Sequence, residues 1–254
     1  MTKTRPDPAR LDPTAPVGPQ LARLIRWSIV SNALEPGMRL SESEIGLRYG
    51  VSRQPVREVF IKLAEEGLVE VRPQRGTFVR KINIANVLDS RFVREAIEAD
   101  IVKACARAPA PGLVEELRSQ LEAQKRARGD DPAVFVTLDD LFHRTLAEGA
   151  GRPSAWGVID GVKSQLDRVR QLTTARMPVD HLVTQHTAVV EAIDARDPNA
   201  AEGAIRHHLQ MILSDLPAIR EACPQFFEPQ DNNPDLSQNR PLRPDPEATQ
   251  GRKP

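Results

Sequence analysis

The apolar residues in the first third of the chain follow the spacing of short helices. Helical periodicity starts with Leu21, Leu24 and Ile25 and ends near the turn at Glu35–Gly37. A clearer stripe follows at positions i, i+3, i+4, i+7 and i+8, and it consists of Val56, Val59, Phe60, Leu63 and Ala64. This spacing places its members on one side of a helix. The pattern predicts a small helical core in this region.

Boundary residues divide this region into three helices. Ser41 followed by Glu44 is a capping box, and Gly50 supplies a stop at the end of the second helix. Ser52 can cap the third helix, and Pro55 falls in its first turn, where a missing N–H costs little. Three short helices with tight connections are therefore expected before residue 67.

Beyond Lys81 the apolar pattern is typical of long helices alone. Six helical segments are expected at residues 85–108, 112–127, 131–151, 153–174, 181–196 and 198–216. Prolines and glycines separate them, and the last two form a helical hairpin around Asp197–Pro198. The predicted fold class is mainly α.

Composition sets the domain boundaries and excludes several classes of protein. We expect a disordered extension (1–16), a small domain of short helices (17–81), a linker (82–85), an all-helical domain (86–222) and a disordered, proline-rich tail (223–254). The chain has 254 residues and two cysteines, which cannot make a disulfide framework. No signal peptide or membrane-spanning run is present, so a cytoplasmic location is expected.

Local charge and geometry point to nucleic acid. The whole chain is neutral, but residues 17–83 contain 11 Lys and Arg against 7 Glu. Arg53 and Arg57 are i and i+4 on the third helix, opposite its apolar stripe. In a helix-turn-helix the start of the second motif helix lies in the major groove, where arginine binds guanine. Two strands, at residues 69–72 and 77–79, then read as a wing. Solvated arginines on a small helix–hairpin core are the alternative.

A resemblance supports the DNA-binding reading. The stretch LSESEIGLRYGVSRQPVREVFIKLAEEGLVEVRPQRGTFV resembles the winged helix of the GntR family of bacterial transcriptional regulators. The resemblance implies a homodimer on double-stranded operator DNA. It assigns DNA contact to Arg53, Gln54, Arg57, Arg75 and Gly76. Many members have Arg where this chain has Ser43, so one contact to DNA is altered or missing.

Histidines suggest a second site in the helical half. All five lie there, and Asp139 and His143 are i and i+4 on one helix. His186 and His208 lie on the two later helices of the hairpin. One carboxylate and three imidazoles can bind Zn, Ni or Mn. From spacing alone, histidines of the core with satisfied hydrogen bonds are the stronger explanation.

The helical half resembles the ligand-sensing domain of the FadR subfamily of GntR regulators, an antiparallel bundle of six or seven helices. The resemblance implies that Asp139, His143, His186 and His208 are metal ligands. His181 and His207 are expected to face elsewhere, and Asp140 is the alternative carboxylate. Arg94 matches an inward-pointing arginine of the family and is expected to bind an effector acid; a surface salt bridge with Glu98 is the alternative. Arg152 replaces the usual asparagine and alters the pocket or only a helix cap.

Two functions follow for the helical half. A sensor would bind a divalent metal and a small carboxylate effector, and would thereby control a repressor; activation is the less common outcome. A metal-dependent hydrolase is the alternative, but the chain lacks the motifs of a general base, a nucleophile elbow or a phosphate loop. The sequence therefore predicts a regulator and not an enzyme.

Overall fold

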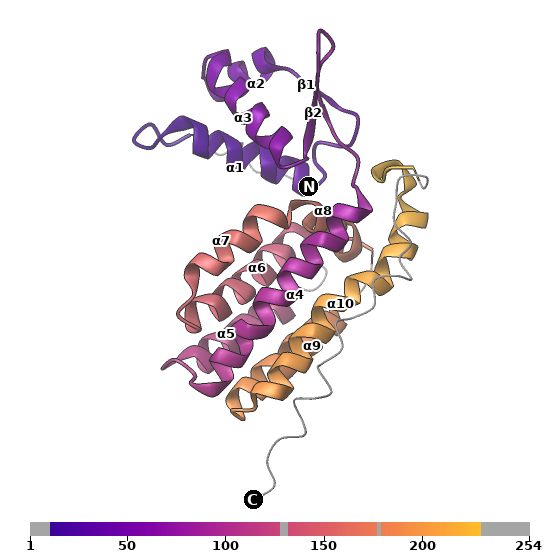
Figure 1. The fold of residues 1–254 in the computed structure, drawn as a ribbon. Coiled ribbons are helices and arrows are strands. Elements are labelled where there is room, and N and C mark those ends of the chain that lie inside the picture. Colours follow the sequence, from indigo (N-terminus) through magenta and orange to yellow (C-terminus); the bar gives the residue numbers. More distant parts are fainter. Residues whose placement is uncertain (1–10, 128–131, 177–178, 230–254) are drawn as a thin grey trace, which may run out of the picture.

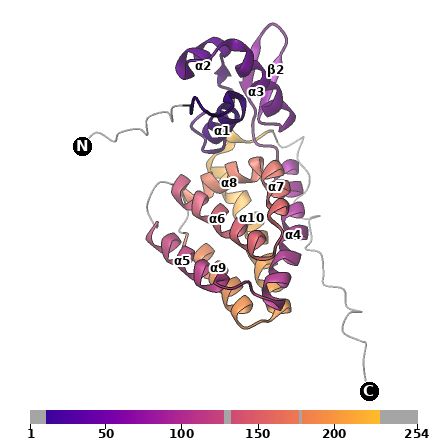
Figure 2. The same ribbon diagram turned by 90° about the vertical axis from the view of Figure 1, so that its left-hand side faces the viewer.

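The computed structural model describes residues 11–127, 132–176 and 179–229. They form a winged helix-turn-helix unit above a bundle of helices (Figure 1). A view turned by 90° shows the same two units stacked end to end, with α1 lying over the end of the bundle (Figure 2). In the described part of the chain, no helix is both long and apolar enough to cross a membrane.

The N-terminal unit is built as the sequence predicts, with one addition. Its elements are α1 (Val17–Val30), β1 (Arg39–Leu40), α2 (Glu42–Tyr49), α3 (Arg53–Glu65), β2 (Val69–Arg72) and β3 (Gly76–Val79). The short strand β1, which was not predicted, pairs with β3, so the antiparallel sheet has the order β1-β3-β2. One side of α3 packs on α1 and buries Val56, Phe60 and Leu63.

Two of the three predicted boundary signals operate here. The Ser41 hydroxyl accepts a hydrogen bond from the Glu44 amide, at 3.3 Å. Gly50 closes α2 in the left-handed conformation, with φ of 67°. Ser52 does occupy the N-cap position of α3, but its side chain makes no capping hydrogen bond, so that part of the prediction is wrong.

Within its described residues, the C-terminal unit is a bundle of seven helices. They are α4 (Ile84–Arg107), α5 (Leu113–Arg126), α6 (Pro132–Gly149), α7 (Pro153–Val162), α8 (Ser164–Thr174), α9 (Asp180–Asp194) and α10 (Pro198–Ala222). The long helices α4 and α10 lie side by side (Figure 1). The single helix predicted over 153–174 is wrong. It breaks at Lys163, whose buried ammonium binds Asp140 and Asp167 from the bend.

Helix α8 joins the two units through hydrogen bonds. The Gln165 amide donates to the Gly67 carbonyl at 2.9 Å, and the Arg168 guanidinium donates to the Arg80 carbonyl at 2.9 Å. The Arg168 carbonyl in turn accepts from the Asn32 amide at 3.3 Å. Arg168 is fully buried, and burial lowers the pKa of its guanidinium to about 10. Helix α8 therefore makes three hydrogen bonds to the winged unit.

Both predicted terminal segments contain ordered residues. After α10, residues Pro224–Phe226 form a short 3-10 helix, and the chain then runs parallel to the linker. The Ile82 amide donates to the Phe226 carbonyl at 2.8 Å, and the Glu228 amide donates to the Ile82 carbonyl at 3.0 Å. We call residues 224–228 the C-terminal strap. The predicted start of a disordered tail at residue 223 is therefore wrong, because these residues bury apolar surface against the linker.

At the other end, residues 11–16 form a turn. The Asp12 amide donates to the Gln20 side chain at 2.7 Å. The expected disordered extension therefore does not reach residue 16. The rest of it, residues 1–10, and the rest of the expected tail, residues 230–254, lie outside the described residues.

Candidate DNA-reading face and metal centre

The exposed side of α3 carries the two predicted arginines. Side chains of Arg53 and Arg57 are 65% and 56% exposed, on the side of the helix opposite its buried stripe. Both guanidinium groups donate to the carboxylate of Glu42 at the start of α2, over 3.0 to 3.3 Å. Hydrogen bonds from Arg57 hold the pKa of Glu42 below its usual value. This exposed side of α3 is accessible to a large anion. In the structure its two arginines pair with the carboxylate of Glu42.

The other residues predicted to contact DNA lie on the same unit. Gln54 is exposed, and its amide donates to Glu58 at 3.0 Å. Arg75 and Gly76 lie at the tip of the wing between β2 and β3. Gly76 has φ of 108°, a backbone conformation that glycine adopts without strain. Arg75 is exposed at this tip, where it can reach a phosphate or a groove.

Four predicted ligands meet inside the bundle. Asp139 and His143 come from α6, His186 from α9 and His208 from α10, and all four are buried. One potential ligand atom from each lies within 4.8 Å of the others. The His208 Nε2 atom lies 3.2 Å from the Nε2 atoms of both His143 and His186. Helices far apart in sequence thus aim one carboxylate and three imidazole nitrogens at one point.

The second nitrogen of each imidazole is already used. The Nδ1 atom of His143 donates to Glu98, and that of His186 donates to the Gln124 side chain at 2.8 Å. The Nδ1 atom of His208 donates to Gln185 at 3.0 Å. Because Nδ1 carries the proton, Nε2 keeps its lone pair. Partners of this kind fix the tautomer and orientation of histidines that bind metals.

Burial keeps two of these imidazoles neutral. It lowers the pKa of both His186 and His208 well below 6.5, and the neighbouring imidazoles and arginines add to that effect. A neutral imidazole is the form that binds a metal ion. The sequence predicted the four residues that meet, but it did not reveal Gln124 or Gln185, since nothing in their local pattern marks a partner for histidine.

Arg94 is buried, so the alternative of a surface salt bridge is wrong. Its side chain is 2% exposed, and its Nε atom donates to Glu98 at 2.7 Å inside the bundle. Burial alone would raise the pKa of Glu98, but Arg94 and His143 outweigh it and hold that pKa at about 2. The Nη2 atom of Arg94 is buried without a hydrogen-bond partner among the described residues. It is available to a ligand.

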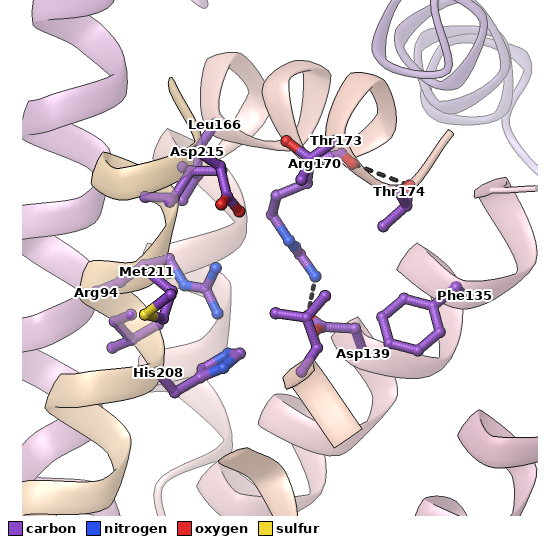
Figure 3. A pocket seen from close by; sticks show the side chains of 13 residues that line it. Arg94, Phe135, Asp139, Leu166, Arg170, Thr173, Thr174, His208, Met211 and Asp215 are labelled. Carbon is purple, nitrogen blue, oxygen red and sulfur yellow. Dashed lines mark hydrogen bonds and ion pairs between the residues drawn. The ribbon is translucent and has the colours of Figure 1, made fainter. Parts of the chain in front are cut away.

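Arg94 faces a pocket beside the four metal-ligand candidates (Figure 3). The pocket also receives Asp139 and His208, and Phe135, Leu166 and Ile212 are among its apolar walls. Arg170, a residue that sequence reasoning missed, enters it from α8 and binds Asp139 (Figure 3). Burial, with the nearby Arg94, lowers the pKa of Arg170 to about 9.

The remaining candidates lie outside this centre. Asp140, the alternative ligand, accepts hydrogen bonds from Lys163 and Arg170 and is not among the four that converge. His207 is exposed, and His181 is likewise not a member of the cluster. Arg152 is exposed at the N-cap of α7, and its side chain makes no capping bond.

Comparison with known proteins covers both units. Residues 19–79 match the family model of bacterial regulatory proteins of the gntR family, and residues 89–211 match the FCD domain. The chain is 40% identical over 223 residues to the HTH-type transcriptional repressor RspR of Escherichia coli (strain K12), which covers 86% of this chain and 96% of RspR.

Solved structures share the fold. E. coli McbR/YncC superposes with a TM-score of 0.69 at 16% identity, over 82% of this chain and 99% of that one. A GntR regulator from Rhodococcus sp. RHA1 gives 0.67 at 24% identity, over 79% and 98%. RspR is named a transcriptional repressor, which gives no support to the hydrolase alternative. The chain belongs to the GntR family as a DNA-binding transcriptional regulator with an FCD effector-binding domain, and it is not an enzyme.

Proposed function

We propose that this regulator is a repressor whose helical domain binds a divalent metal and a small organic acid, and that these ligands control operator binding. One observation carries the proposal. Asp139, His143, His186 and His208 form one buried group, and two of them, Asp139 and His208, line a pocket together with Arg94, whose Nη2 atom has no hydrogen-bond partner among the described residues. A metal and a guanidinium side by side can hold a carboxylate between them.

The donor set fits a divalent ion of the Zn, Ni or Mn type. Three imidazoles and one carboxylate suit these metals, whereas Mg²⁺ and Ca²⁺ prefer oxygen ligands alone. Glu98, Gln124 and Gln185 hold the imidazoles in the required tautomer. Bound there, the metal would supply a Lewis-acidic position for an anionic oxygen of the effector.

The pocket favours a small acid with an apolar part. Arg94 offers a hydrogen-bond donor, and a second cation, Arg170, enters from α8. Phe135, Leu166 and Leu209 are among the apolar residues that line the remaining space. A charged ligand end would therefore face the metal, while hydrocarbon would lie against these walls.

On DNA, the exposed face of α3 would enter the major groove. Arg53, Gln54 and Arg57 would read bases there, and Arg75 and Gly76 in the wing would contact the minor groove or phosphates. The relative RspR is named a transcriptional repressor, which favours repression for this chain as well. A change in the bundle on ligand binding would be transmitted to the winged unit through α8 and the linker.

A homodimer would place two winged units on a pseudo-palindromic operator, one on each half-site. Helices α4 and α7 support such an assembly. They are joined by a hydrogen bond from Ser90 to the Val162 carbonyl, and both expose apolar side chains: Phe92 is 48% exposed and Val158 is 55% exposed. Gly157, on the same helix as Val158, has open space where a Cβ atom would be, so a second helix can approach closely.

Two experiments test these proposals. Metal analysis of the purified chain, followed by melting with Zn²⁺, Ni²⁺ or Mn²⁺ after chelation, should show bound metal and a raised melting temperature. A DNA sequence selected from a random pool should then be released by one member of a panel of organic acids. A protein that carries no metal and ignores all three ions would refute the metal site.

The dimer is tested by sedimentation. Val158→Glu should convert dimer to monomer and abolish cooperative operator binding, because it places a charge in an apolar interface. Val134→Glu alters a valine that is 44% exposed on α6 and should leave the assembly intact. If Val158→Glu and Val134→Glu have the same oligomeric state, the dimer interface does not lie at Val158.

A further inference from the structure

Arg170 holds the metal-ligand candidate Asp139 in this structure. Its Nη2 atom binds the Asp139 carboxylate, and its side chain is 13% exposed. Its Nη1 atom donates to Asp167 at 2.9 Å and to Asp140 at 3.2 Å. The two ends of one guanidinium therefore have different roles. Nη1 anchors the group to α8 and α6, while Nη2 neutralises the one carboxylate that points at the three imidazoles.

We propose that Arg170 is a built-in counter-cation, which takes the place of the metal charge at Asp139 and swings its Nη2 atom to the effector carboxylate when the metal binds. This inference rests on the proposed function and deepens it. A divalent ion at the imidazole cluster would need the Asp139 oxygens and would repel the adjacent guanidinium. Only the Nη2 contact has to break, because the Nη1 bonds go to Asp140 and Asp167, which are not among the four residues that converge.

The pocket offers a new partner for the released group. Arg170 and Arg94 line the same cavity, and the Nη2 atom of Arg94 is already unpartnered among the described residues (Figure 3). After release, two guanidinium donors would converge beside the metal. Such a set recognises a carboxylate by paired, charge-assisted hydrogen bonds. The effector is therefore a carboxylate that binds after the metal, since the metal-free pocket spends one of these donors on Asp139.

The same helix gives the movement a route to the reading domain. Arg170 lies two residues after Arg168 and five after Gln165, the two residues of α8 that bind the winged unit. A change in the side-chain bonds of Arg170 therefore acts on the helix that touches the backbone at Gly67 and Arg80. The counter-cation links metal occupancy to the junction between the units.

Metal titration of charge variants tests the proposal. The probe is Zn²⁺ alone, and its Kd is measured by competition with a chromogenic chelator in the full chain. Arg170→Met removes the competing cation while keeping a long side chain, so Zn²⁺ should bind at least tenfold more tightly than in the wild type. Arg118→Met removes the same charge from an exposed site on α5, where Arg118 pairs with Asp194, and should leave the Kd unchanged.

A second measurement follows the wild-type chain and uses a charge-conserving variant only to assign one signal. Arginine side-chain ¹⁵N resonances of the wild-type chain are followed during Zn²⁺ addition, with the Arg170 signal assigned from its loss in Arg170→Lys. The Arg170 resonance should shift as the site fills, while that of Arg118 stays in place. An immobile Arg170 signal at saturation, or a Zn²⁺ Kd equal or weaker in Arg170→Met, would overturn the counter-cation role. If neither wild type nor variant binds Zn²⁺, the proposed function fails with it.

Discussion

The reading face and the metal centre use the same arrangement of charge in opposite surroundings. On α3, two arginines stand ready for an anion, and Glu42 holds both of them. In the bundle, Asp139 stands ready for a cation, and Arg170 holds it. Each site thus keeps a chain residue of the same sign as the expected partner. Glu42 on α2 and Arg170 in the bundle therefore each carry the charge that the expected ligand of their site would bring.

Burial makes the two arrangements differ in energy. Exposed ion pairs such as those of Glu42 contribute only about 0.2–1 kcal/mol, since water and salt screen them. The charges around Asp139 are buried, and leaving one of them unpaired costs roughly several kcal/mol. The reading face can therefore exchange Glu42 for DNA at little cost. In the candidate metal centre, the proposed exchange would require a cation at Asp139 before Arg170 is released.

The largest effect is expected from removing a ligand in the buried site. His186→Ala should weaken metal binding more than about 100-fold, beyond the usual loss on removing an outer partner of a ligand. The metal-induced rise in melting temperature should vanish with it. Metal analysis and thermal unfolding measure both, with the exposed His207→Ala as a matched control. A variant that keeps its metal would show that His186 is a core residue alone.

On the exposed site the expected loss is smaller. Arg53→Ala should weaken specific operator binding by about 1–3 kcal/mol and relax sequence preference at one position. Affinity of the wild type should fall with salt at a slope near −0.9 per phosphate neutralised. Fluorescence anisotropy at several salt concentrations measures both effects. An unchanged affinity in Arg53→Ala would contradict the proposal that α3 binds in the major groove.

Lowering the pH should destabilise the bundle and leave the stability of the winged unit unchanged. Metal-free His186 and His208 have lowered pKa values in the folded chain, while the unfolded chain takes up protons near 6.5. The unfolded state then binds more protons, so stability of the bundle falls as pH drops below 6.5, by up to about 1.4 kcal/mol per unit of pKa difference. The winged unit contains no histidine and should not respond there.

Each unit has one tryptophan to report this difference, Trp27 in α1 and Trp156 in α7. Urea unfolding of Trp27→Phe and Trp156→Phe, stripped of metal, therefore follows each unit by itself. Between pH 7.5 and 5.5 the midpoint reported by Trp156 should fall and that reported by Trp27 should stay. A parallel fall of both midpoints would contradict the assignment.

The smallest effect is expected at the exposed counter-ion. Glu42→Gln removes the charge that holds Arg53 and Arg57 but keeps a side chain of the same size. Operator affinity should rise, by less than about 1 kcal/mol, because only a screened pair is lost. Anisotropy at low salt measures it, and Glu44→Gln, on the same short helix, serves as the control. A loss of affinity would mean that Glu42 positions the arginines for the bases.

Local patterns predicted most of the fold, and they predicted which residues would meet at the metal centre. The stripe Val56–Leu63 and the caps at Ser41 and Gly50 act within one turn or two, so the sequence displays them directly. The histidines were found through helical spacing and family resemblance. Metal binding by them, and DNA contact by the arginines, stay predictions.

The missed features depend on packing between distant segments. Arg170 reaches Asp139 across 31 residues, and Gln124 reaches His186 across 62, so no local window contains either pair. Strand β1 has two residues, too few for a periodic signal. The bend at Lys163 follows from acidic partners on another helix and from its own fourth neighbour.

The C-terminal strap has a consequence for how the protein is made. The ribosome synthesises the winged unit before the bundle, yet the hydrogen bonds that hold Ile82 come from Phe226 and Glu228, which are made only after all seven helices described in the bundle. A nascent chain can therefore fold the winged unit before Ile82, in the linker, makes these hydrogen bonds. Proteolytic trimming after Ala222 would remove Cys223, Phe226 and Phe227 from the apolar cluster around Ile82, while the core of the winged unit and the hydrogen bonds from α8 would remain, so trimming should loosen the linker without unfolding the winged unit.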